Sequence, residues 1–552
     1  MSVEKLYTRK ATGLVREISI LTAVLIAICN TVGLGWQKRV FQATGWTPVG
    51  ESQFFLGIHP VVMAFFITGI VILISLYCFA MLSAAMPRSG GGYIFISRIL
   101  GPFWGVVATW FQFFAVAVSY GLIAVAVMEA VMIFGSLAGI TQLGLWATPG
   151  GLFIFGALVT ILFSGIACFG VKMTGYLLQI LFWVPAVVLV LVYIVFLMAN
   201  PATMDAGVKA LWGHSATEYT QAAITQGMDK IAAGNTYWGA VFSAMVAAYW
   251  AYIGYAAASF VAGEVKEAHK TLPRAMFTSG VVIIFLYMTI STLMARAAMM
   301  VGKVGDFSLM SAMGFLNYGG GSFAKAGLPK IGGWMPMVAA MQTAGMGWTW
   351  LLPLLVFFAA FWVANDIPPF ILSTSRMIFA MAFDRLLPPA LANVNEKWHS
   401  PVNAIIFTSV VTIVLGCTAE SGVIADIWPG SFLATFTSGF AVGVTDLWDI
   451  LFFGIVAIAA MLFPIRKPDI FERSPFRLSK NLTITLGALA VLGNAFAFVI
   501  VANAGGFWTD PLQLGLSGLV LILGVVLYWY YSNAARRTGV ELKTLFTEIP
   551  PD

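Results

Sequence analysis

The stretch Asn-Thr-Val-Gly-Leu-Gly, residues 30–35, interrupts the first long apolar segment of the chain. Residues 14–28 before it have the composition of a membrane helix, and apolar sequence resumes after it. Unwound backbone inside a bilayer is tolerated only where it lines a cavity or is buried in protein. The break therefore predicts a functional cavity within a membrane span.

A second apolar segment carries a similar break around Ile253, Gly254 and Tyr255. Interrupted helices at matching positions of two halves indicate the binding site of a secondary transporter. We therefore expect the cargo to lie between the two breaks. Each break also has a simpler interpretation: close helix packing by small residues at the first, and an aromatic packing stripe at the second.

The composition is that of a membrane protein. The 552 residues are 60% hydrophobic and 9% charged, whereas soluble domains carry about 25% charged residues. The apolar stretches are long enough to cross a hydrocarbon core of about 30 Å as helices. A β-barrel would alternate apolar and polar residues instead. These properties predict an all-α polytopic membrane protein in a lipid bilayer.

About twelve spans are expected, and the first and sixth carry the breaks. Five spans separate the two breaks, so spans 1–5 and 6–10 are expected to form two inverted repeats. The predicted division is an N-terminal segment (1–14), a first repeat (15–199), an extracellular loop (200–236), a second repeat (237–464), two further spans (465–531) and a C-terminal tail (532–552). Residues 301–345 are expected to form a second long outer loop. Residues 421–445 fit either a re-entrant piece or an extension of a neighbouring span.

Most of the 29 Lys and Arg residues fall on the side predicted to hold both termini. By the positive-inside rule this side is cytoplasmic, which predicts a multi-pass protein of the cell membrane with cytoplasmic N- and C-termini. The same bias explains the net charge of +6 without a nucleic-acid partner. The four Cys and four His show no disulfide or metal spacing, so no cofactor is expected.

Several motifs resemble the amino acid permeases of the amino acid–polyamine–organocation (APC) superfamily. The matching segments are Pro87 with Gly90–Tyr93, Gly101-Pro102, Gly170–Lys172, Gly263–Lys266 with Leu272–Ala275, and Ser375-Arg376 with Asp384, Leu387-Pro388, Val394-Asn395 and Pro401. The match runs from about residue 14 to residue 480. Each motif is loose, but their order and spacing are specific.

The resemblance implies a five-plus-five inverted-repeat fold with discontinuous helices 1 and 6 and alternating access. It implies that an α-amino acid is held by its backbone groups at two sets of sites. The implied substrate-binding residues are Gly33, Leu34 and Gly35 for the carboxylate, Thr31, Trp250 and Ile253 for the ammonium, and Thr109, Tyr255 and Phe370 for the side chain. Tyr93 falls at a cytoplasmic-side gating position.

The chain departs from the family pattern in three places. Some members carry Glu where this chain has Ala256, which makes arginine or polyamine a less expected cargo and favours neutral amino acids. Many members carry a Lys in the fifth span where this chain has Pro185. The eighth span reads Ala364–Pro369, where small hydroxyl residues are more usual.

Asp366 lies in the cytoplasmic half of the eighth span. An ionised carboxylate in hydrocarbon costs at least about 2.5–3.5 kcal/mol, so such residues usually face the bundle interior and serve function. We interpret Asp366 as the site of the coupling proton, with Asn365 as a hydrogen-bond partner. Coordination of sodium by Asp366 is the second option. The simpler alternative is a structural carboxylate that caps backbone groups freed by Pro368 and Pro369.

Lys38 and Arg39 follow the first break, where they could attract an anionic cargo. The favoured interpretation is a pair of interfacial charges, and Glu129 is also predicted to be interfacial.

The sequence thus favours a secondary active transporter for amino acids, driven by proton or sodium symport, with exchange (antiport) as an alternative. An ion channel would need repeated polar rings or a filter loop, which the sequence does not show. A membrane enzyme is disfavoured because no catalytic constellation stands out.

Overall fold

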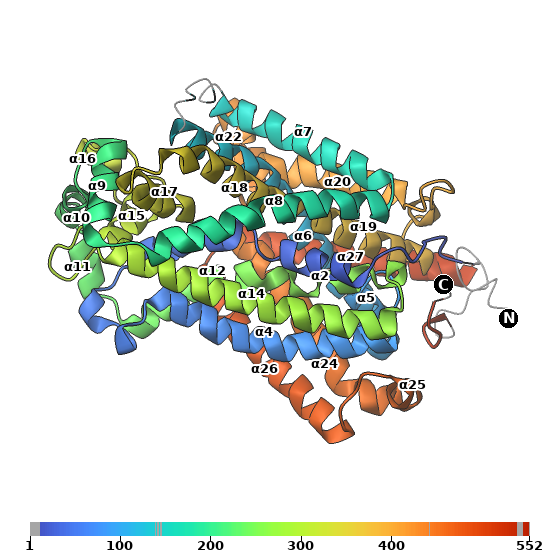
Figure 1. Cartoon of the computed structure of the whole chain (residues 1–552). Helices are drawn as coiled ribbons and strands as arrows, with labels where there is room; N and C mark the ends of the chain where they lie inside the picture. Colours follow the sequence, from blue (N-terminus) through green and yellow to red (C-terminus); the bar gives the residue numbers. More distant parts are fainter. Residues whose placement is uncertain are drawn as a thin grey trace.

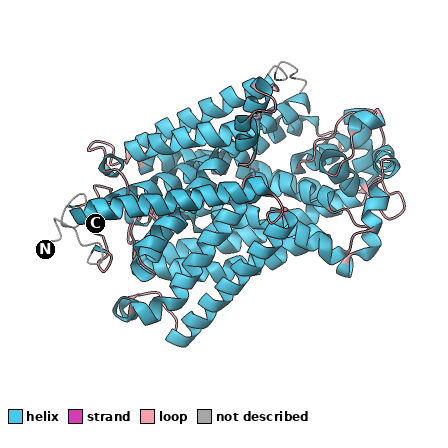
Figure 2. Ribbon diagram, turned by 180° about the vertical axis from the view of Figure 1, so that it is seen from behind, coloured by secondary structure: helices cyan, strands magenta, loops and turns pink. Residues whose placement is uncertain are grey.

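The computed structural model describes residues 11–137, 140, 143, 146–440, 442–537 and 545–550. In this part of the chain the regular structure is helical, and strand pairing is limited to isolated bridges between Ile18 and Val265 and between Val304 and Phe307 (Figure 2). Among the described residues, 11 helices are long and apolar enough to cross a membrane, and Ile20–Cys29 is a shorter apolar helix. The predicted all-α polytopic fold class is confirmed.

The spans form one bundle (Figure 1). Eight are uninterrupted: α4 (Pro60–Ala85), α6 (Pro102–Leu137), α7 (Pro149–Cys168), α8 (Val171–Leu197), α14 (Ala268–Met299), α24 (Val442–Arg466), α26 (Lys480–Ala504) and α27 (Pro511–Arg537). Four others consist of consecutive pieces: α2 (Ile20–Cys29), η1 (Gly35–Arg39) and α3 (Val40–Trp46); α12 (Tyr237–Tyr252), η5 (Ile253–Ala256) and α13 (Ala257–Phe260); α18 (Leu352–Ala364) and α19 (Ile367–Phe383); and α20 (Val402–Val411), η9 (Thr412–Cys417) and α21 (Thr418–Ser421).

The two ends of the bundle differ. We call the end at which α2 begins and α27 ends the terminal side; it also holds the short helices α5 (Gly92–Ile99) and α25 (Pro468–Arg473). The opposite end, the cap side, carries α9 (Pro201–Trp212), α10 (Ala216–Thr225), α11 (Met228–Ala233), α15 (Leu309–Tyr318), α16 (Phe323–Ala326) and α17 (Met335–Gly345) (Figure 1). The two segments expected as loops, 200–236 and 301–345, are thus largely helical.

Small residues let the cap pack closely. A Cβ at Gly45 would overlap the carbonyl of Gly314, so α3 and α15 touch through their backbones. A Cβ at Gly207 would likewise overlap the carbonyl of Met341 on α17. The cap is therefore fixed directly to the outer half of the first span.

The first span begins at Ile20 and not at residue 15 as expected. Residues before Ile20 are extended: Ile18 N–H donates to Glu264 O at 2.9 Å, and Lys266 N–H donates to Ile18 O at 3.0 Å. The Ser19 hydroxyl then accepts from Thr22 N–H and caps the helix. Residues 1–10 of the predicted N-terminal segment, and 538–544 and 551–552 of the predicted tail, lie outside the described residues.

The eighth span contains a third break that the sequence analysis did not predict. Helix α18 ends at Ala364, Asn365 and Asp366 form a turn, and α19 begins at Ile367. Pro368 and Pro369 follow in the first turn of α19, where their missing N–H groups cost nothing to a new helix start. The proline pair that was interpreted as part of one helix therefore marks the start of another.

Residues 421–445 include the last residue of α21, the first four residues of α24 and, between them, two short separate helices. They are α22 (Val423–Ile427) and α23 (Phe432–Ser438), between α21 and α24. Residue 441 lies outside the described residues. Ile427, Trp428 and Phe432 are exposed.

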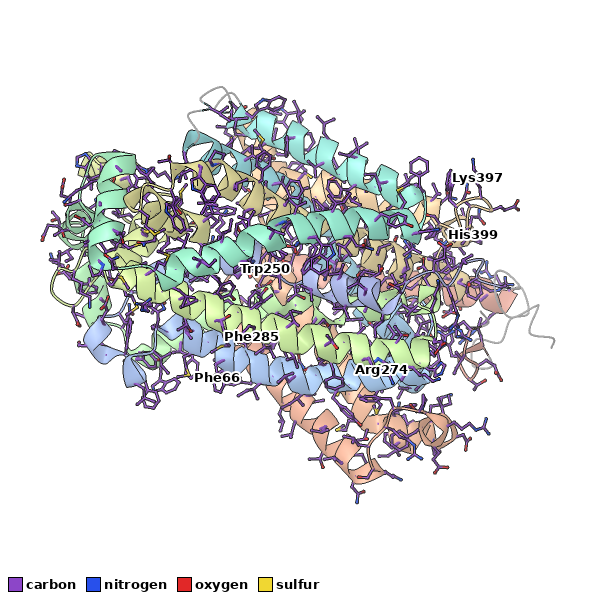
Figure 3. All side chains as sticks on the ribbon, viewed as in Figure 1. Phe66, Trp250, Arg274, Phe285, Lys397 and His399 are labelled. Atoms are coloured by element: carbon purple, nitrogen blue, oxygen red, sulfur yellow. The ribbon has the colours of Figure 1, made fainter. Side chains whose placement is uncertain are left out.

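The outer surface of the bundle is apolar. Phe66 on α4 and Phe285 on α14 lie on this surface and are 50% and 63% exposed, whereas Trp250 lies within the bundle and is 8% exposed (Figure 3). Arg274, Lys397 and His399 lie at the terminal side (Figure 3). An apolar belt between polar ends is the arrangement that a bilayer requires.

We predict that Gly254→Ala destabilises the protein, because the added Cβ would overlap the carbonyl and side-chain amide of Asn30 across the two breaks. The expected result is a lower thermal unfolding temperature of the purified protein in detergent. Gly165→Ala is the matched control, since a Cβ at this α7 glycine meets nothing within 4 Å, and Ala in a helix interior is favoured over Gly by about 1 kcal/mol. Equal unfolding temperatures for the two variants would contradict the contact.

Candidate functional site

The two predicted breaks pack against each other in the middle of the bundle. The carbonyl of Asn30 lies against Gly254, where a side chain would not fit. Gly35 in turn faces Ala251 and Trp250 on α12. The absence of side chains at Gly254 and Gly35 is what allows the two unwound segments to meet.

Tyr287 on α14 joins the breaks through its hydroxyl. This hydroxyl lies within hydrogen-bond distance of the carbonyl oxygens of Thr31, at 2.5 Å, and Ala251, at 2.7 Å. The Tyr287 side chain is fully buried. Carbonyl groups that the breaks leave without helical partners are thus held by one side chain from a neighbouring span.

Asp366 occupies a notch in the first break. Its carboxyl group lies so close to Gly33 that a Cβ there would overlap it. The carboxylate accepts a hydrogen bond from the backbone N–H of Leu34, while the N–H of Gly33 donates to Thr31 O at 3.2 Å. Asp366 is 4% exposed and its Oδ1 has no hydrogen-bond partner. The turn between α18 and α19 therefore places a carboxylate on an amide that the family resemblance assigns to the cargo.

Asn365 sits beside Asp366 in the same turn. Its side chain is fully buried, and neither its Oδ1 nor its Nδ2 has a hydrogen-bond partner. Buried side-chain amides normally have hydrogen-bond partners, so the two unpaired atoms of Asn365 are unusual. A ligand, an ion or water at this turn would provide the missing partners.

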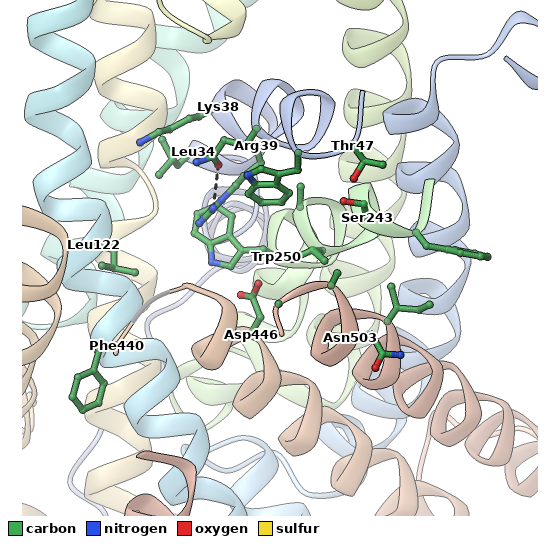
Figure 4. A pocket seen from close by; sticks show the side chains of 18 of the residues that line it. Leu34, Lys38, Arg39, Thr47, Leu122, Ser243, Trp250, Phe440, Asp446 and Asn503 are labelled. Carbon is green, nitrogen blue, oxygen red and sulfur yellow. Dashed lines mark hydrogen bonds between the residues drawn. The ribbon is translucent and has the colours of Figure 1, made fainter. Parts of the chain in front are cut away.

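A cavity of about 940 Å³ opens from the cap side down to the first break. It is lined by residues of α3, α6, α12, α21, α23, α24 and α26 together with η1, and Leu34, Trp250 and Asp446 are among them (Figure 4). This volume lies at the upper end of the range of about 300–1,000 Å³ found for small-molecule sites. Of the residues predicted to hold the cargo, Leu34 and Trp250 line the cavity.

The other predicted substrate residues do not line the cavity. Thr31, Gly33 and Gly35 belong to the first break and are buried, whereas Ile253, in the 3₁₀ turn after α12, is partly buried. Thr109 on α6 is fully buried with an unpartnered hydroxyl. Tyr255 packs against Phe79 and Phe453, with ring centroids 5.9 Å and 5.2 Å away. Phe370 is buried on α19.

Charged groups surround the cavity. Lys38 Nζ pairs with Glu129 Oε2 at 2.8 Å, so these two residues form an ion pair and are not isolated interfacial charges. The Arg39 guanidinium lies over the Trp250 ring, 4.6 Å from its centroid, and donates to Gln42 Oε1 at 3.0 Å. Asp446 points toward this stacked pair (Figure 4). Both carboxylate oxygens of Asp446 are buried without a hydrogen-bond partner.

The bundle is closed on the terminal side by buried ion pairs. The Arg376 guanidinium donates to both carboxylate oxygens of Glu264, at 2.8 Å and 2.9 Å. Asp384 accepts from Arg98 and from the hydroxyl of Tyr93, the latter at 2.8 Å. All five side chains are nearly or fully buried. Tyr93, the predicted gating residue, is thus part of the closure opposite the cavity.

A short segment near the C-terminus covers this closure. The Phe546 ring lies under the Arg98 guanidinium, 4.7 Å from ring centroid to Cζ. Arg88 Nε donates to Pro550 O at 2.6 Å, and Lys467 Nζ donates to Thr547 O at 3.4 Å. Residues 545–550 therefore connect three basic side chains of the terminal side.

Sequence reasoning missed Tyr287, Asp446, Asp449 and Arg98. Tyr287 lies in an uninterrupted apolar helix and carries no local signal. Asp446 and Asp449 could have been found by the rule that singled out Asp366, because both are carboxylates within a predicted membrane span. Arg98 belongs to the stretch that carries the Gly90–Tyr93 motif, but only the fold brings it to Asp384.

Broken helices that meet beside a one-sided cavity, in a bundle closed at its other end, define a membrane transporter. A sequence model described as amino acid permease matches residues 18–526. The chain therefore belongs to the amino acid permeases of the APC superfamily.

Individual relatives are distant, and their matches cover from about three quarters to nearly all of this chain. The large neutral amino acids transporter small subunit 2 of Oryctolagus cuniculus is 22% identical over 547 residues, covering 97% of this chain and 85% of that protein. The serine/threonine exchanger SteT of Bacillus subtilis is 23% identical over 523 residues, covering 94% and 97%. An uncharacterised transporter of Mycobacterium tuberculosis is 24% identical over 410 residues, covering 73% and 74%. These relatives support a transport role for the chain and not an enzymatic one.

We predict that Tyr287→Phe loosens the contact between the two breaks. The carbonyls of Thr31 and Ala251 would lose the one O–H that they share, and an unsatisfied buried group costs roughly 1–3 kcal/mol, although Thr31 O keeps the N–H of Gly33. The unfolding temperature should fall. Tyr193→Phe is the control, because its hydroxyl bonds to Thr289 at 2.6 Å in a partly exposed site away from the breaks. A loss no greater than that of the control would show that the bridge is not needed.

We predict that removal of residues 545–552 loosens the closure on the terminal side. Arg88, Arg98 and Lys467 each lose a contact with this segment. Hydrogen–deuterium exchange of peptides spanning residues 88–99 should become faster, while peptides from the cap helix α17 should exchange as before. Unchanged exchange over residues 88–99 would mean that the segment lies on the closure without stabilising it.

Proposed function

We propose that the chain is a secondary active transporter that moves neutral α-amino acids across the cell membrane by alternating access, coupled to proton symport. The cap side is extracellular in this proposal, because the basic residues concentrate at the terminal side. The structure then corresponds to an outward-facing state, with the cavity open to the outside and the ion pairs closed on the inside. Ala256 favours a neutral cargo, and the names of two relatives refer to large neutral amino acids and to serine and threonine.

The cargo is held through its backbone groups at the floor of the cavity. Its carboxylate takes the amides of Gly33, Leu34 and Gly35, and its ammonium takes the carbonyls of Thr31, Trp250 and Ile253. Helix starts favour anions and free carbonyls favour cations, so the two breaks suit the two ends of a zwitterion. The ring of Trp250 lies at the cavity wall beside this position, and Thr109, Tyr255 and Phe370 enclose the side chain.

One observation carries the coupling proposal: the Asp366 carboxylate lies in the Gly33 notch and accepts from Leu34 N–H. The cargo carboxylate needs the same donor, so the two carboxylates compete for it. Two anions at one amide would also repel each other strongly in a site of low dielectric. Binding of the cargo is therefore easiest once Asp366 is protonated or displaced.

Protonation of Asp366 provides the link to the proton gradient. A neutral carboxyl is a weaker acceptor for Leu34 N–H and does not repel the incoming anion. Its new O–H needs an acceptor, and the orphaned Oδ1 of Asn365 belongs to the same turn. A proton and a cargo molecule thus bind best together, which is the requirement for symport.

Two alternatives use the same residues. Sodium bound by Asp366 and Asn365 would also neutralise the carboxylate, giving sodium symport. If Asp366 stays in one protonation state through the cycle, the cargo moves only against another cargo molecule, as in the relative named an exchanger. In each case the closure at Tyr93, Asp384 and Arg98 must open to release cargo on the inner side.

We predict that purified protein in proteoliposomes accumulates a neutral amino acid when the outside is made acidic, and that Asp366→Asn abolishes this accumulation. The amide cannot take up a proton, so it should leave exchange of internal for external cargo while removing the response to the gradient. Asp426→Asn is the control, because Asp426 is exposed on α22.

The outcomes separate the alternatives. Accumulation driven only by external sodium would replace the proton by sodium, and flux that needs internal cargo but no gradient would indicate exchange. Full acid-driven accumulation by the Asp366→Asn variant would overturn the assigned role of Asp366. Absence of saturable uptake for every amino acid tested would overturn the cargo.

A further inference from the structure

A group of buried acceptor oxygens lies between α24 and α6, above the breaks. Asp446 and Asp449 are three residues apart on α24 and so point to the same side of the helix. They are 1% and 2% exposed. Both oxygens of Asp446, Oδ1 of Asp449 and Oε1 of Gln112 lack hydrogen-bond partners. All four atoms are hydrogen-bond acceptors, so this group of oxygens lacks hydrogen-bond donors.

The group is connected to the cavity. Asp446 lines it directly, and Figure 4 shows its carboxylate pointing toward Arg39 and Trp250. Asp449 lies one helical turn closer to the terminal side and accepts a hydrogen bond from the Gln112 side-chain amide. Gln112 is one turn along α6 from Thr109, which the family resemblance places at the cargo side chain. The acceptors thus adjoin the part of the site that the cargo side chain reaches.

We propose that Asp446 and Asp449 bind hydrogen-bond donors on the cargo side chain, so that the transporter selects hydroxyl- and amide-bearing amino acids over apolar ones of the same size. The inference rests on the proposed function, which it makes more specific. An apolar side chain would remove water from these oxygens and leave them unpaired. A site built to hydrogen-bond a group rejects analogues that lack it far more strongly than an apolar pocket rejects a different shape.

Neutral donors fit better than cationic side chains. Arg39 acts electrostatically on Asp446, and Lys38 lines the same cavity. Glu129 is paired with Lys38, and Glu420 also lies at the cavity near Arg39. Two cations of η1, Lys38 and Arg39, already line the cavity, so a further positive charge would meet repulsion as well as attraction. A hydroxyl or an amide satisfies the acceptors without that repulsion.

The test uses pairs of amino acids that match in size and differ in donors. Uptake of labelled threonine into proteoliposomes is competed with unlabelled threonine or valine, and with asparagine or leucine. We expect the donor-bearing member of each pair to compete at about tenfold lower concentration. Asp446→Asn and Asp449→Asn should reduce this ratio toward one, whereas Asp426→Asn should keep it.

Each result decides between outcomes. A wild-type ratio near one, or one in favour of valine and leucine, overturns the inference without any variant, and leaves the proposed function intact because uptake is still observed. Stronger competition by lysine or arginine than by threonine overturns the neutral class. A ratio unchanged in both folded variants overturns the role of the two carboxylates. No uptake of any amino acid refutes the proposed function itself.

Discussion

The contact between the Asp366 carboxyl group and the backbone at Gly33 is the constraint around which the centre of the molecule is arranged. Three discontinuities meet near it: the break after α2, the break after α12, and the turn between α18 and α19. Each leaves backbone groups that cannot remain unpaired in a bilayer. Asp366 supplies an acceptor for Leu34 N–H, and Tyr287 supplies a donor for two carbonyls. These two side chains therefore supply partners for backbone groups of the unwound segments.

In this arrangement the structural role of Asp366 does not conflict with the coupling role that we propose for it. The simpler interpretation of Asp366, a carboxylate that caps freed backbone, agrees with its hydrogen bond to Leu34. The capped amide, however, belongs to the first break and not to the proline turn that carries Asp366 itself. If the first break binds the cargo as we propose, a cap on its backbone is also sensitive to the cargo. The structural interpretation and the proposed role in coupling are therefore compatible.

The sequence predicted those features that are energetically costly inside a membrane span. It did not predict features that are compatible with an ordinary apolar helix. Glycines at 33, 35 and 254 predicted two breaks, and the charge of Asp366 predicted a buried functional group, because each would be costly in an ordinary span. The third break escaped notice, since a proline pair is compatible with both a kink and a helix start. Tyr287 was also missed, because a tyrosine in an apolar helix is unremarkable until its hydroxyl is seen between two carbonyls. The cap helices have a polar, Gly-rich composition that resembles a loop, and tertiary packing decides their structure.

Different interactions are found at the two ends of the bundle: buried ion pairs at the terminal side and apolar side chains at the cap side. On the terminal side, Arg376 with Glu264 and Arg98 with Asp384 are ion pairs removed from water, and loss of one partner alone would leave a buried unpaired charge at a cost of about 3–5 kcal/mol. On the cap side, the cavity is bordered by aromatic side chains such as Trp46, Phe242 and Phe440, whose burial would gain about 25 cal/mol per Å² of apolar surface. A conformational exchange would thus balance hydration of ions at one end against burial of apolar surface at the other. A ligand shifts such a balance only by as much as its affinities for the two states differ.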